Sequence, residues 1–366
     1  MKILSVTTGR SDVGHLEPVW REIVKRQGWD LTILNLGPYQ LSLEWSGNYW
    51  AFPRKEQNDS PGEISRALAA VFRDAQWAYT RLSPDLILVV GDRYEALGAV
   101  SGALFFGIPV AHIGGGDETS GAYDNQIRHA ITKMAHVHFV AHEAARERVL
   151  AMGEEGWRVY ETGLPSLDGI RQWMQVPGNV EHRGQEEGLV VIFHPPTLEL
   201  DTAEQQAREV GRALVSVGCP VKGFIPGHDV LHEKVRRAVI DACAGRISSE
   251  WFDQETPEDF YRTLSRAACL VGNSSAGIIE ACSFGLPVIN IGSRQEGRVR
   301  PINVFDVAAK AGEIAAAILH ALSPEIRAGC QGLVNPYGDG HAAGRIVAAL
   351  ASLPDKDTLL KKRWAT

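Results

Sequence analysis

The segment 269–285, CLVGNSSAGIIEACSFG, places two adjacent hydroxyl groups where an apolar strand passes into an apolar helix. Serine is a preferred N-cap residue, because its side chain accepts a hydrogen bond from a free amide of the first helical turn. The same free amides, together with the helix dipole, also favour an anion such as phosphate. Ser274 and Ser275 therefore have two interpretations, a helix cap and an anion anchor, and one pair of hydroxyls can serve as both.

Charged, imidazole and hydroxyl side chains follow predicted strands in both halves of the chain. In an open parallel sheet, ligands bind beyond the carboxyl ends of the strands. One charged residue there is most often a solvated loop residue, but its repetition from strand to strand indicates a binding site. The first half contributes Arg10, Asp12, Asp92, Arg93, Glu95, His112, Asp117 and Glu118, and the second half contributes His194, Thr197, His228, Asp229, Asn273, Ser274, Ser275, Arg294 and Arg298.

The two halves differ in the chemistry that they offer. Carboxylates come mainly from the first half, whereas the second half contributes the paired hydroxyls Ser274 and Ser275 together with Arg294 and Arg298. This division is typical of a nucleotide-sugar site, with the diphosphate at a helix start and the sugar beneath acid–base groups. The chain contains neither GxxxxGK[ST] nor GxGxxG, so neither a P-loop nor a dinucleotide fingerprint is predicted.

The segment 121–138, GAYDNQIRHAITKMAHVH, belongs to the same predicted site. Asp124 begins a helix that carries Arg128 and His129, and these two cannot both face the core because adjacent helical residues point in different directions. His136 and His138 are close in sequence, but two ligands are too few for a metal site. A helix end followed by a strand is the favoured interpretation, and we expect no metal.

Alternating apolar runs and helical patterns must position these residues. The alternation predicts parallel sheets covered on both faces, and two such series predict an α/β fold of two Rossmann-like, doubly wound domains. Strands are expected at 2–8, 30–36, 85–91, 109–113, 137–141, 158–162, 189–194, 220–225, 247–252, 268–272 and 287–291. Helices are expected near 14–27, 62–82, 93–106, 124–135, 143–152, 202–217, 231–244, 257–267, 275–284, 307–321 and 341–353.

The predicted domains are residues 1–168, which carry the acid–base residues, and residues 169–350, which bind the nucleotide. The join falls within 165–188, a stretch rich in Gly, Pro and charge that lacks a strand pattern. The segment 351–366 ends in the basic run KDTLLKKRWAT, which is either solvated or packed back on the first domain. The aromatic-rich segment 38–60 is expected to be a packed loop or a flap over a ligand.

Composition excludes several classes of function. The length of 366 residues suits two domains, and 45% hydrophobic with 22% charged residues indicates a soluble globular protein. A formal net charge of −7 argues against a general nucleic-acid binder. Five scattered cysteines without a CxxC pair indicate reduced thiols in a cytoplasmic protein. The chain start turns polar too early for a signal peptide, and no apolar run reaches the length of a membrane span.

Taken together, these segments resemble the UDP-N-acetylglucosamine 2-epimerases, specifically the hydrolysing branch that makes N-acetylmannosamine for sialic-acid-type sugars. The matching segments are GRSDVG, VVGDRYEAL, HIGGGDETSGAYD, IRHAITKMAHVHF, FHPPTLE and GNSSAGIIEACSFGLPVINIGSRQEGR, in this order. The resemblance implies a glycosyltransferase-B architecture, two Rossmann-like domains facing a cleft. It also implies a UDP-sugar substrate, no metal or redox cofactor, and a homodimer.

The resemblance also implies roles for individual residues. It makes Asp92 and Asp124 catalytic carboxylates and puts His194 near the phosphate or the sugar. The implied substrate-binding residues are Arg10, Arg93, His112, Asn273, Ser274, Ser275, Glu280 and Arg294, with Glu280 at the ribose.

Three positions depart from the family pattern. Relatives have a catalytic Glu where this chain has Gly114, so Asp117, Glu118 or His112 would have to replace it. His15 occupies the position of a ligand-binding Lys, and the expected Asn near Asp229 is Gly227. These departures leave a modified nucleotide sugar open as the substrate. A non-hydrolysing epimerase, a glycosyltransferase and a catalytically inactive nucleotide-sugar sensor remain the alternative functions.

Overall fold

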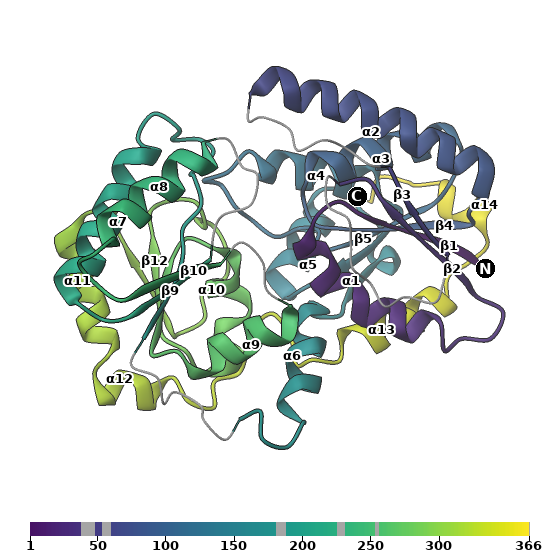
Figure 1. Ribbon diagram of the computed structural model, residues 1–366. Helices are drawn as coiled ribbons and strands as arrows, with labels where there is room; N and C mark the ends of the chain where they lie inside the picture. The colour runs from purple at the N-terminus through teal and green to yellow at the C-terminus, as the bar shows by residue number, and fades with distance from the viewer. Residues whose placement is uncertain (38–47, 53–59, 181–187, 225–230, 253–255, 366) are drawn as a thin grey trace. The chain divides into compact units, whose positions relative to one another are not determined.

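The computed structural model of the protein describes residues 1–37, 48–52, 60–180, 188–224, 231–252 and 256–365 (Figure 1). The chain groups into two compact units. Unit 1 comprises Met1–Glu118, Asp124–Gly169 and Tyr337–Thr366, and unit 2 comprises Thr119–Tyr123 and Ile170–Pro336.

Unit 1 is built on a parallel sheet that has seven strands within the described residues. They are β1 (Lys2–Thr7), β2 (Asp30–Asn35), β3 (Asn48–Ala51), β4 (Leu86–Val90), β5 (Val110–Ile113), β6 (Val137–Val140) and β7 (Val159–Glu161). The helices are α1 (Arg10–Ile23), α2 (Pro61–Leu82), α3 (Tyr94–Phe105), α4 (Asp124–Met134), α5 (Glu143–Ala151), η1 (Gly156–Arg158), α13 (Ala342–Ala351) and α14 (Lys356–Leu360).

Local sequence explains these elements. The strand β4 has the sequence LILVV, and all five side chains are buried because helices cover both faces of the sheet. The longest helix, α2, begins where the Ser60 hydroxyl accepts a hydrogen bond from the Glu63 amide and Pro61 occupies the first turn. It ends at Ser83, whose left-handed backbone (φ 45°) stops the helix.

Unit 2 repeats the design with six parallel strands in the described residues. They are β8 (Leu189–Ile192), β9 (Val221–Phe224), β10 (Ser249–Phe252), β11 (Cys269–Gly272), β12 (Val288–Ile291) and β13 (Val304–Val307). The helices are α7 (Ala203–Val217), α8 (His232–Cys243), α9 (Pro257–Arg266), α10 (Ser275–Ile279), η2 (Ala281–Phe284), α11 (Ala311–Ala321) and α12 (Pro324–Gly329), and α6 (Ser166–Met174) crosses the boundary between the units.

The strand order identifies where a ligand would bind in each unit. The order is β3-β2-β1-β4-β5-β6-β7 in unit 1 and β10-β9-β8-β11-β12-β13 in unit 2. In both sheets the order reverses after the first strand of the series, at β1/β4 and at β8/β11. Open α/β sheets bind ligands at this switch point, beyond the carboxyl ends of the strands. Two doubly wound parallel sheets confirm the predicted fold class.

Several elements differ from the sequence-based expectation. The edge strands β3 and β13 were not expected, and β13 begins in a region without a predicted strand. The helix α6 lies in the predicted join. Most of the 38–60 segment, including Trp45, lies outside the described residues.

The C-terminal boundary of the second unit differs from the predicted domain boundary. The second domain was expected to reach residue 350, but α13 belongs to unit 1. The Asp168 carboxylate accepts hydrogen bonds from the Ala342 and Ala343 amides at 2.9 and 2.8 Å, which fixes the start of α13. The segment 351–365 also belongs to unit 1.

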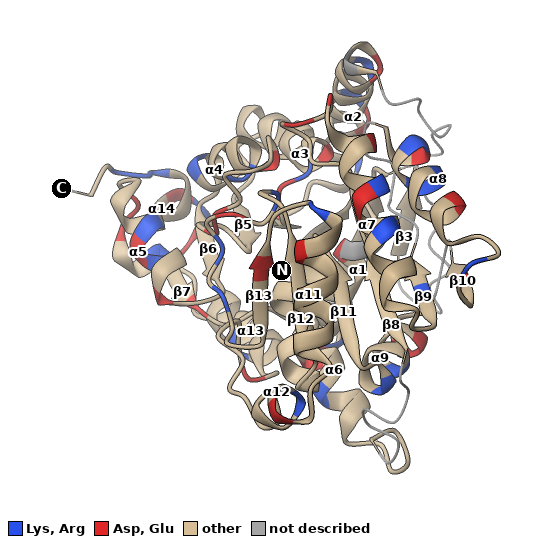
Figure 2. Cartoon of the chain, turned by 90° about the vertical axis from the view of Figure 1, so that its left-hand side faces the viewer, with Lys and Arg blue, Asp and Glu red and all other residues tan. Residues whose placement is uncertain are grey.

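The surface helices of unit 2 carry charges of both signs. Figure 2 shows Lys and Arg beside Asp and Glu along α7 and α8. Within these helices, Arg208 pairs with Glu204 and Arg237 with Glu233, each one helical turn apart. Such exposed pairs contribute little to stability. No helix in the described part of the chain is both long and apolar enough to cross a lipid bilayer.

Candidate functional site

The switch point of unit 1 contains a carboxylate held by a buried guanidinium. Gly91 follows β4 and has a left-handed backbone (φ 77°). Asp92 comes next, and the Asp92 side chain is 26% exposed. Arg128, on the second turn of α4 and 2% exposed, donates to this carboxylate. Arg128 also donates to the Asp117 carbonyl at 3.1 Å and to Asn125 Oδ1 at 3.3 Å. The carboxylate is therefore paired, oriented and still reachable from solvent.

A second carboxylate, this one buried, shapes the loop after β1. Asp12 Oδ2 accepts hydrogen bonds from the Thr8 amide and hydroxyl, both at 2.7 Å, and from the Gly9 amide at 3.1 Å. Burial raises the pKa of Asp12 to about 6, against the attraction of the nearby Arg93 guanidinium. Arg93 itself pairs with the buried Glu95 at 3.2 Å. These contacts join the loops after β1 and β4, and they fix the backbone that leads into Arg10.

His112 is a buried structural contact of this site. Its ring is fully buried, and Nε2 donates to the Gly91 carbonyl at 2.8 Å. The Thr132 hydroxyl lies 3.2 Å from Nδ1 and 2.9 Å from the Arg128 carbonyl. Burial lowers the pKa of His112 to about 3, so the ring is neutral. His112 links the Asp92 loop to α4, and its expected contact with substrate stays a prediction.

Two further carboxylates follow β5. Glu118, 28% exposed, pairs with Arg148 Nε at 3.0 Å and accepts from Asn125 Nδ2 at 3.2 Å. Asp117 is 5% exposed, and its Oδ1 lies 3.6 Å from His142 Nε2. Gly114 has a left-handed backbone (φ 79°), which L side chains rarely adopt, although a Cβ there would meet nothing closer than 3.8 Å. Of the candidates to replace a Glu at this position, Glu118 is the most accessible.

The remaining predicted residues of unit 1 lie on the helices α1 and α4. Asp124 is the first residue of α4, where a carboxylate favours the helix dipole, and its side chain is half-buried. His15 is half-buried on α1. Arg10 is the first residue of α1, at the end of the loop that Asp12 holds.

The switch point of unit 2 depends on a close approach of two strands. A Cβ at Gly272 would lie 1.9 Å from the Ile192 carbonyl oxygen, and the backbone there has φ 148°, so only glycine fits. Directly after it, Asn273 is 1% exposed; its Oδ1 accepts from the His194 amide at 2.7 Å, and its Nδ2 donates to the His194 carbonyl at 2.8 Å. Asn273 thus fixes the backbone of His194 and is itself removed from solvent.

The hydroxyl pair begins α10, as the sequence predicts. Ser274 is the N-cap, and its Oγ accepts from the Ala276 amide at 3.3 Å. Ser275 is the first helical residue, and both serines are half-buried. Glu280 follows the last residue of this short helix. The cap interpretation is confirmed, and it leaves the anion interpretation open.

Arginine and glutamine side chains approach the same backbone from the loop after β12. Arg294 Nη1 and Gln295 Nε2 donate to the Asn273 carbonyl at 3.1 and 2.9 Å. Ser293 donates to Glu199, which follows β8. Gln295 and Glu199 were not predicted as site residues, since glutamine and glutamate in a loop carry no distinctive pattern. The predicted Asp229 lies outside the described residues.

A short segment from the first half of the sequence groups with unit 2. Within Thr119–Tyr123, the Ser120 amide donates to the Glu296 carbonyl at 2.9 Å and the Tyr123 amide to Thr197 Oγ1 at 3.3 Å. Gly121 packs against the backbone of Ser293, and an added Cβ would lie only 2.0 Å from the Ser293 carbonyl oxygen. This segment therefore contacts the loop that carries Arg294, immediately before Asp124 in sequence.

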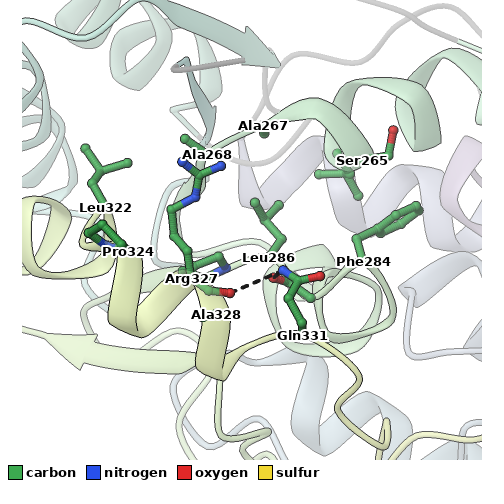
Figure 3. Close-up of a pocket in the computed structure, with 13 residues that line it drawn as sticks. Ser265, Ala267, Ala268, Phe284, Leu286, Leu322, Pro324, Arg327, Ala328 and Gln331 are labelled. Atoms are coloured by element: carbon green, nitrogen blue, oxygen red, sulfur yellow. Dashed lines mark hydrogen bonds between the residues drawn. The ribbon is translucent and has the colours of Figure 1, made fainter. Parts of the chain in front are cut away.

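A cavity of about 330 Å³ in unit 2 lies elsewhere (Figure 3). It is lined by residues that precede β11 and β12 and by α12, among them Ala268, Leu286 and Arg327. It is thus at the amino ends of the strands, away from the serine pair. Within the described ranges, no group of three or more His, Cys, Asp or Glu residues could hold a metal ion.

Comparison with known proteins identifies the family of this chain. Residues 53–351 match the model of the UDP-N-acetylglucosamine 2-epimerase family. The hydrolysing UDP-N,N'-diacetylbacillosamine 2-epimerase of Legionella pneumophila is 30% identical over 380 residues, covering 99% of this chain and 98% of that protein. The UDP-N-acetylglucosamine 2-epimerase of Neisseria meningitidis is 32% identical over 320 residues and 81% of each chain.

Solved structures share the fold. A UDP-GlcNAc 2-epimerase from Neisseria meningitidis, solved with UDP-GlcNAc, has a TM-score of 0.82 at 19% identity and covers 96% of this chain and 100% of its own. An S. aureus protein solved with UDP has a TM-score of 0.80 at 17% identity, covering 97% and 99%. These neighbours have the glycosyltransferase-B-like fold. The chain belongs to the UDP-N-acetylglucosamine 2-epimerase family and is a nucleotide-sugar 2-epimerase.

Proposed function

We propose that the enzyme is a hydrolysing 2-epimerase that converts UDP-N-acetylglucosamine and water to N-acetylmannosamine and UDP. Its IRHAITK segment resembles the corresponding segment of the hydrolysing branch. Two relatives that are similar over most of the chain are named as hydrolysing 2-epimerases. The observation that carries the proposal is the ion pair between Asp92 and Arg128, because it joins this segment to a carboxylate at the switch point of unit 1.

The reaction has two steps. In the first, a base removes the proton from sugar C2, the C–H electron pair forms a C1=C2 double bond, and the C1–O bond breaks as its electrons leave with UDP. In the second, water adds its oxygen to C1 of this glycal while C2 receives a proton on the opposite face. The sum is one nucleotide sugar and one water converted to UDP and the epimerised free sugar.

Unit 1 supplies the acid–base groups in this proposal. Asp92 is paired, oriented and 26% exposed, as a proton-transferring carboxylate must be. Glu118 takes the place of the Glu that relatives have at Gly114, because it is the more accessible carboxylate after β5 and Arg148 holds it. Asp124 provides the second of the two carboxylates that the resemblance assigns. A positioned acid or base contributes roughly 10²–10⁴-fold to such a step.

Unit 2 binds UDP in this proposal. Ser274 and Ser275 offer hydroxyls beside the first amides of α10, and Arg294 brings a cation within 3.1 Å of the backbone just before them. His194 contributes an imidazole from the neighbouring strand end. Negative charge builds up on the diphosphate as the C1–O bond breaks, so donors already directed at it lower the barrier.

The second candidate substrate is UDP-N,N'-diacetylbacillosamine. The Legionella pneumophila relative named for that sugar aligns with 99% of this chain. This chain also has Gly114 where the family pattern has a Glu, and an added Cβ there would meet nothing closer than 3.8 Å, so the position is open.

The test is a screen of UDP-N-acetylglucosamine, UDP-N,N'-diacetylbacillosamine and their GDP counterparts with purified enzyme. We expect free UDP and the 2-epimerised free sugar in equal amounts. Accumulation of an epimerised nucleotide sugar without free UDP would refute hydrolysis. Sedimentation of the same preparation tests the homodimer expected from the resemblance.

A further inference from the structure

Two cations, one of them fully buried, tie the segment Asp355–Ala365, hereafter the clasp segment, to the rest of unit 1. The first is Arg158, whose guanidinium is fully buried. It donates to the Leu359 carbonyl at 2.9 Å and the Lys361 carbonyl at 3.2 Å, and to the His136 carbonyl at 3.1 Å. It thereby satisfies carbonyl groups at the end of α14, where a cation is favoured.

The second cation is Lys362. Its Nζ donates to the Lys133 carbonyl at 2.8 Å and to the Ala135 carbonyl at 2.5 Å. Both carbonyls lie at the C-terminal end of α4, which ends at Met134. An ammonium group there satisfies carbonyls that have no partner within the helix and complements the helix dipole. The Lys362 side chain is 19% exposed.

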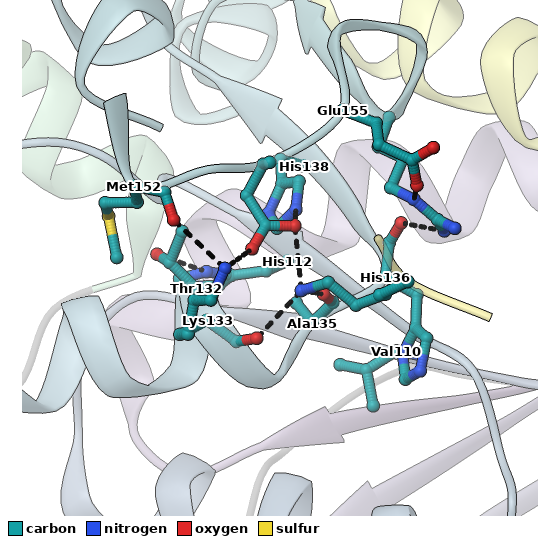
Figure 4. A network of polar contacts seen from close by, with 12 residues as sticks. Val110, His112, Thr132, Lys133, Ala135, His136, His138, Met152 and Glu155 are labelled. Carbon is teal, nitrogen blue, oxygen red and sulfur yellow. Dashed lines mark hydrogen bonds and ion pairs between the residues drawn. The ribbon is translucent and has the colours of Figure 1, made fainter. Parts of the chain in front are cut away.

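A buried carboxylate completes the network (Figure 4). Glu154, whose side chain is fully buried, binds Lys362 and Lys133 at 2.8 Å each and His138 Nε2 at 3.0 Å. Burial alone would raise the pKa of Glu154, but the donors His138, Lys133 and Lys362 lower it to about 2. Lys362 is therefore held between a permanent negative charge and the end of α4.

The contact is shaped for this segment. The Trp364 ring lies 4.3 Å from Lys133 Nζ and packs against Gly153, where an added Cβ would come within 2.5 Å of the ring. The backbone at Gly153 is left-handed (φ 81°), and its carbonyl accepts from the Ala365 amide at 3.1 Å. The left-handed turn after α5 favours glycine there in any case, and the missing Cβ also leaves room for the Trp364 ring.

The other turns of α4 carry the groups of the candidate site. Arg128 binds Asp92, and Thr132 contacts His112. At about 1.5 Å per residue, Arg128 lies only about 7.5 Å along the helix from Lys133. A shift of the helix end would therefore move the guanidinium that orients Asp92.

We propose that Lys362 is a positioning residue of the epimerase, which fixes the end of α4 and thereby the Arg128 guanidinium against Asp92. The proposal rests on the role of Asp92 proposed above. The competing explanation is that the clasp segment adds stability to unit 1 without any effect on the reacting groups.

The test compares Lys362→Met, which keeps the apolar stem and removes the charge, with Lys361→Met, the same change at an exposed neighbour. We expect kcat to fall on the order of 10-fold in Lys362→Met, with KM and UDP affinity unchanged, because misplacement of reacting groups reduces turnover and not binding. Hydrogen–deuterium exchange should rise in peptides covering 124–135. Lys361→Met should match the wild type in every measurement.

Rescue separates charge from packing. Lys362→Cys alkylated to aminoethylcysteine restores the ammonium at nearly the same length, and kcat should recover, with alkylated wild type as the control. Unchanged kcat or unchanged exchange of α4 in Lys362→Met would overturn the proposal, as would a failure of aminoethylation to restore kcat.

Two further outcomes are distinguishable. Should Lys362→Met fail to fold, Trp364→Ala weakens the same contact of the clasp segment with α4 through Lys133. The fall in kcat and the rise in exchange should then be smaller, because Trp364 is 67% exposed. A wild type that releases no nucleotide from any sugar would refute the proposed function. The exchange of α4 would still decide whether Lys362 holds the helix.

Discussion

Replacing Arg128 by Met removes the counter-charge of Asp92 and is the most informative single substitution. Arg128 is 2% exposed and makes one charged and two neutral hydrogen bonds, to Asp92, the Asp117 carbonyl and Asn125. Removing one partner of a buried ion pair costs about 3–5 kcal/mol. Because Asp92 is 26% exposed, water compensates part of this cost, so the lower end of the range applies.

Lost hydrogen bonds add to this cost, and the apolar Met side chain offsets part of it. A neutral hydrogen bond contributes about 1 kcal/mol. We therefore expect the free energy of unfolding to fall by about 3–4 kcal/mol, measured by urea denaturation followed by circular dichroism. Turnover, measured as nucleotide release, should fall by at least roughly 10²-fold, because Asp92 loses its orientation.

Two control variants isolate the cause. Arg128→Lys keeps the charge but loses the planar fork, so its stability and turnover should lie between those of wild type and Arg128→Met. Arg146→Met removes a partly exposed arginine that pairs with the exposed Glu143 at 3.4 Å, and should change stability by less than about 1 kcal/mol. Wild-type turnover in Arg128→Met would refute the role assigned to Asp92, and a stability loss no larger than that of Arg146→Met would refute the buried pair.

Three further predictions concern other parts of the site. Glu118→Gln should reduce turnover on the order of 10²–10⁴-fold at unchanged UDP affinity, and equal turnover would exclude Glu118 as an acid or base. Ser274→Ala should cost about 1 kcal/mol of stability through the lost cap and weaken UDP binding roughly 10-fold by calorimetry; unchanged affinity would leave the cap as its sole role. The pKa of Asp12 is raised from 3.8 to about 6, so its stabilising contribution is present below pH 3.8 and is lost as the pH rises through about 6. Wild type should lose about 3 kcal/mol over that window relative to Asp12→Asn, and parallel pH profiles of unfolding would contradict this.

Most of the fold was predictable because local sequence patterns mark most of its strands and helices. Central strands such as β4 are continuous apolar runs, and α2 has a serine cap and a proline in its first turn. Edge strands β3 and β13 escaped prediction, since each is four residues long and only half-buried, so neither a long apolar run nor clear alternation marks it.

The contacts that join distant segments could not be predicted. Arg128 and Asp92 are 36 residues apart, and Asp168 binds amides 174 and 175 residues away. No pattern in one sequence indicates such partners. The residue types of the candidate site were predicted from their positions after strands. The burial of His112 and Asn273 could not be predicted, because burial depends on the packing of several elements at once.

The central claim is that C2 of the sugar exchanges its proton while UDP departs from C1. The direct measurement is incubation of UDP-N-acetylglucosamine with the enzyme in D₂O, followed by NMR and mass spectrometry of the free sugar. The proposed reaction predicts N-acetylmannosamine with one deuterium at C2, together with one equivalent of UDP. A released sugar that retains hydrogen at C2 would contradict it.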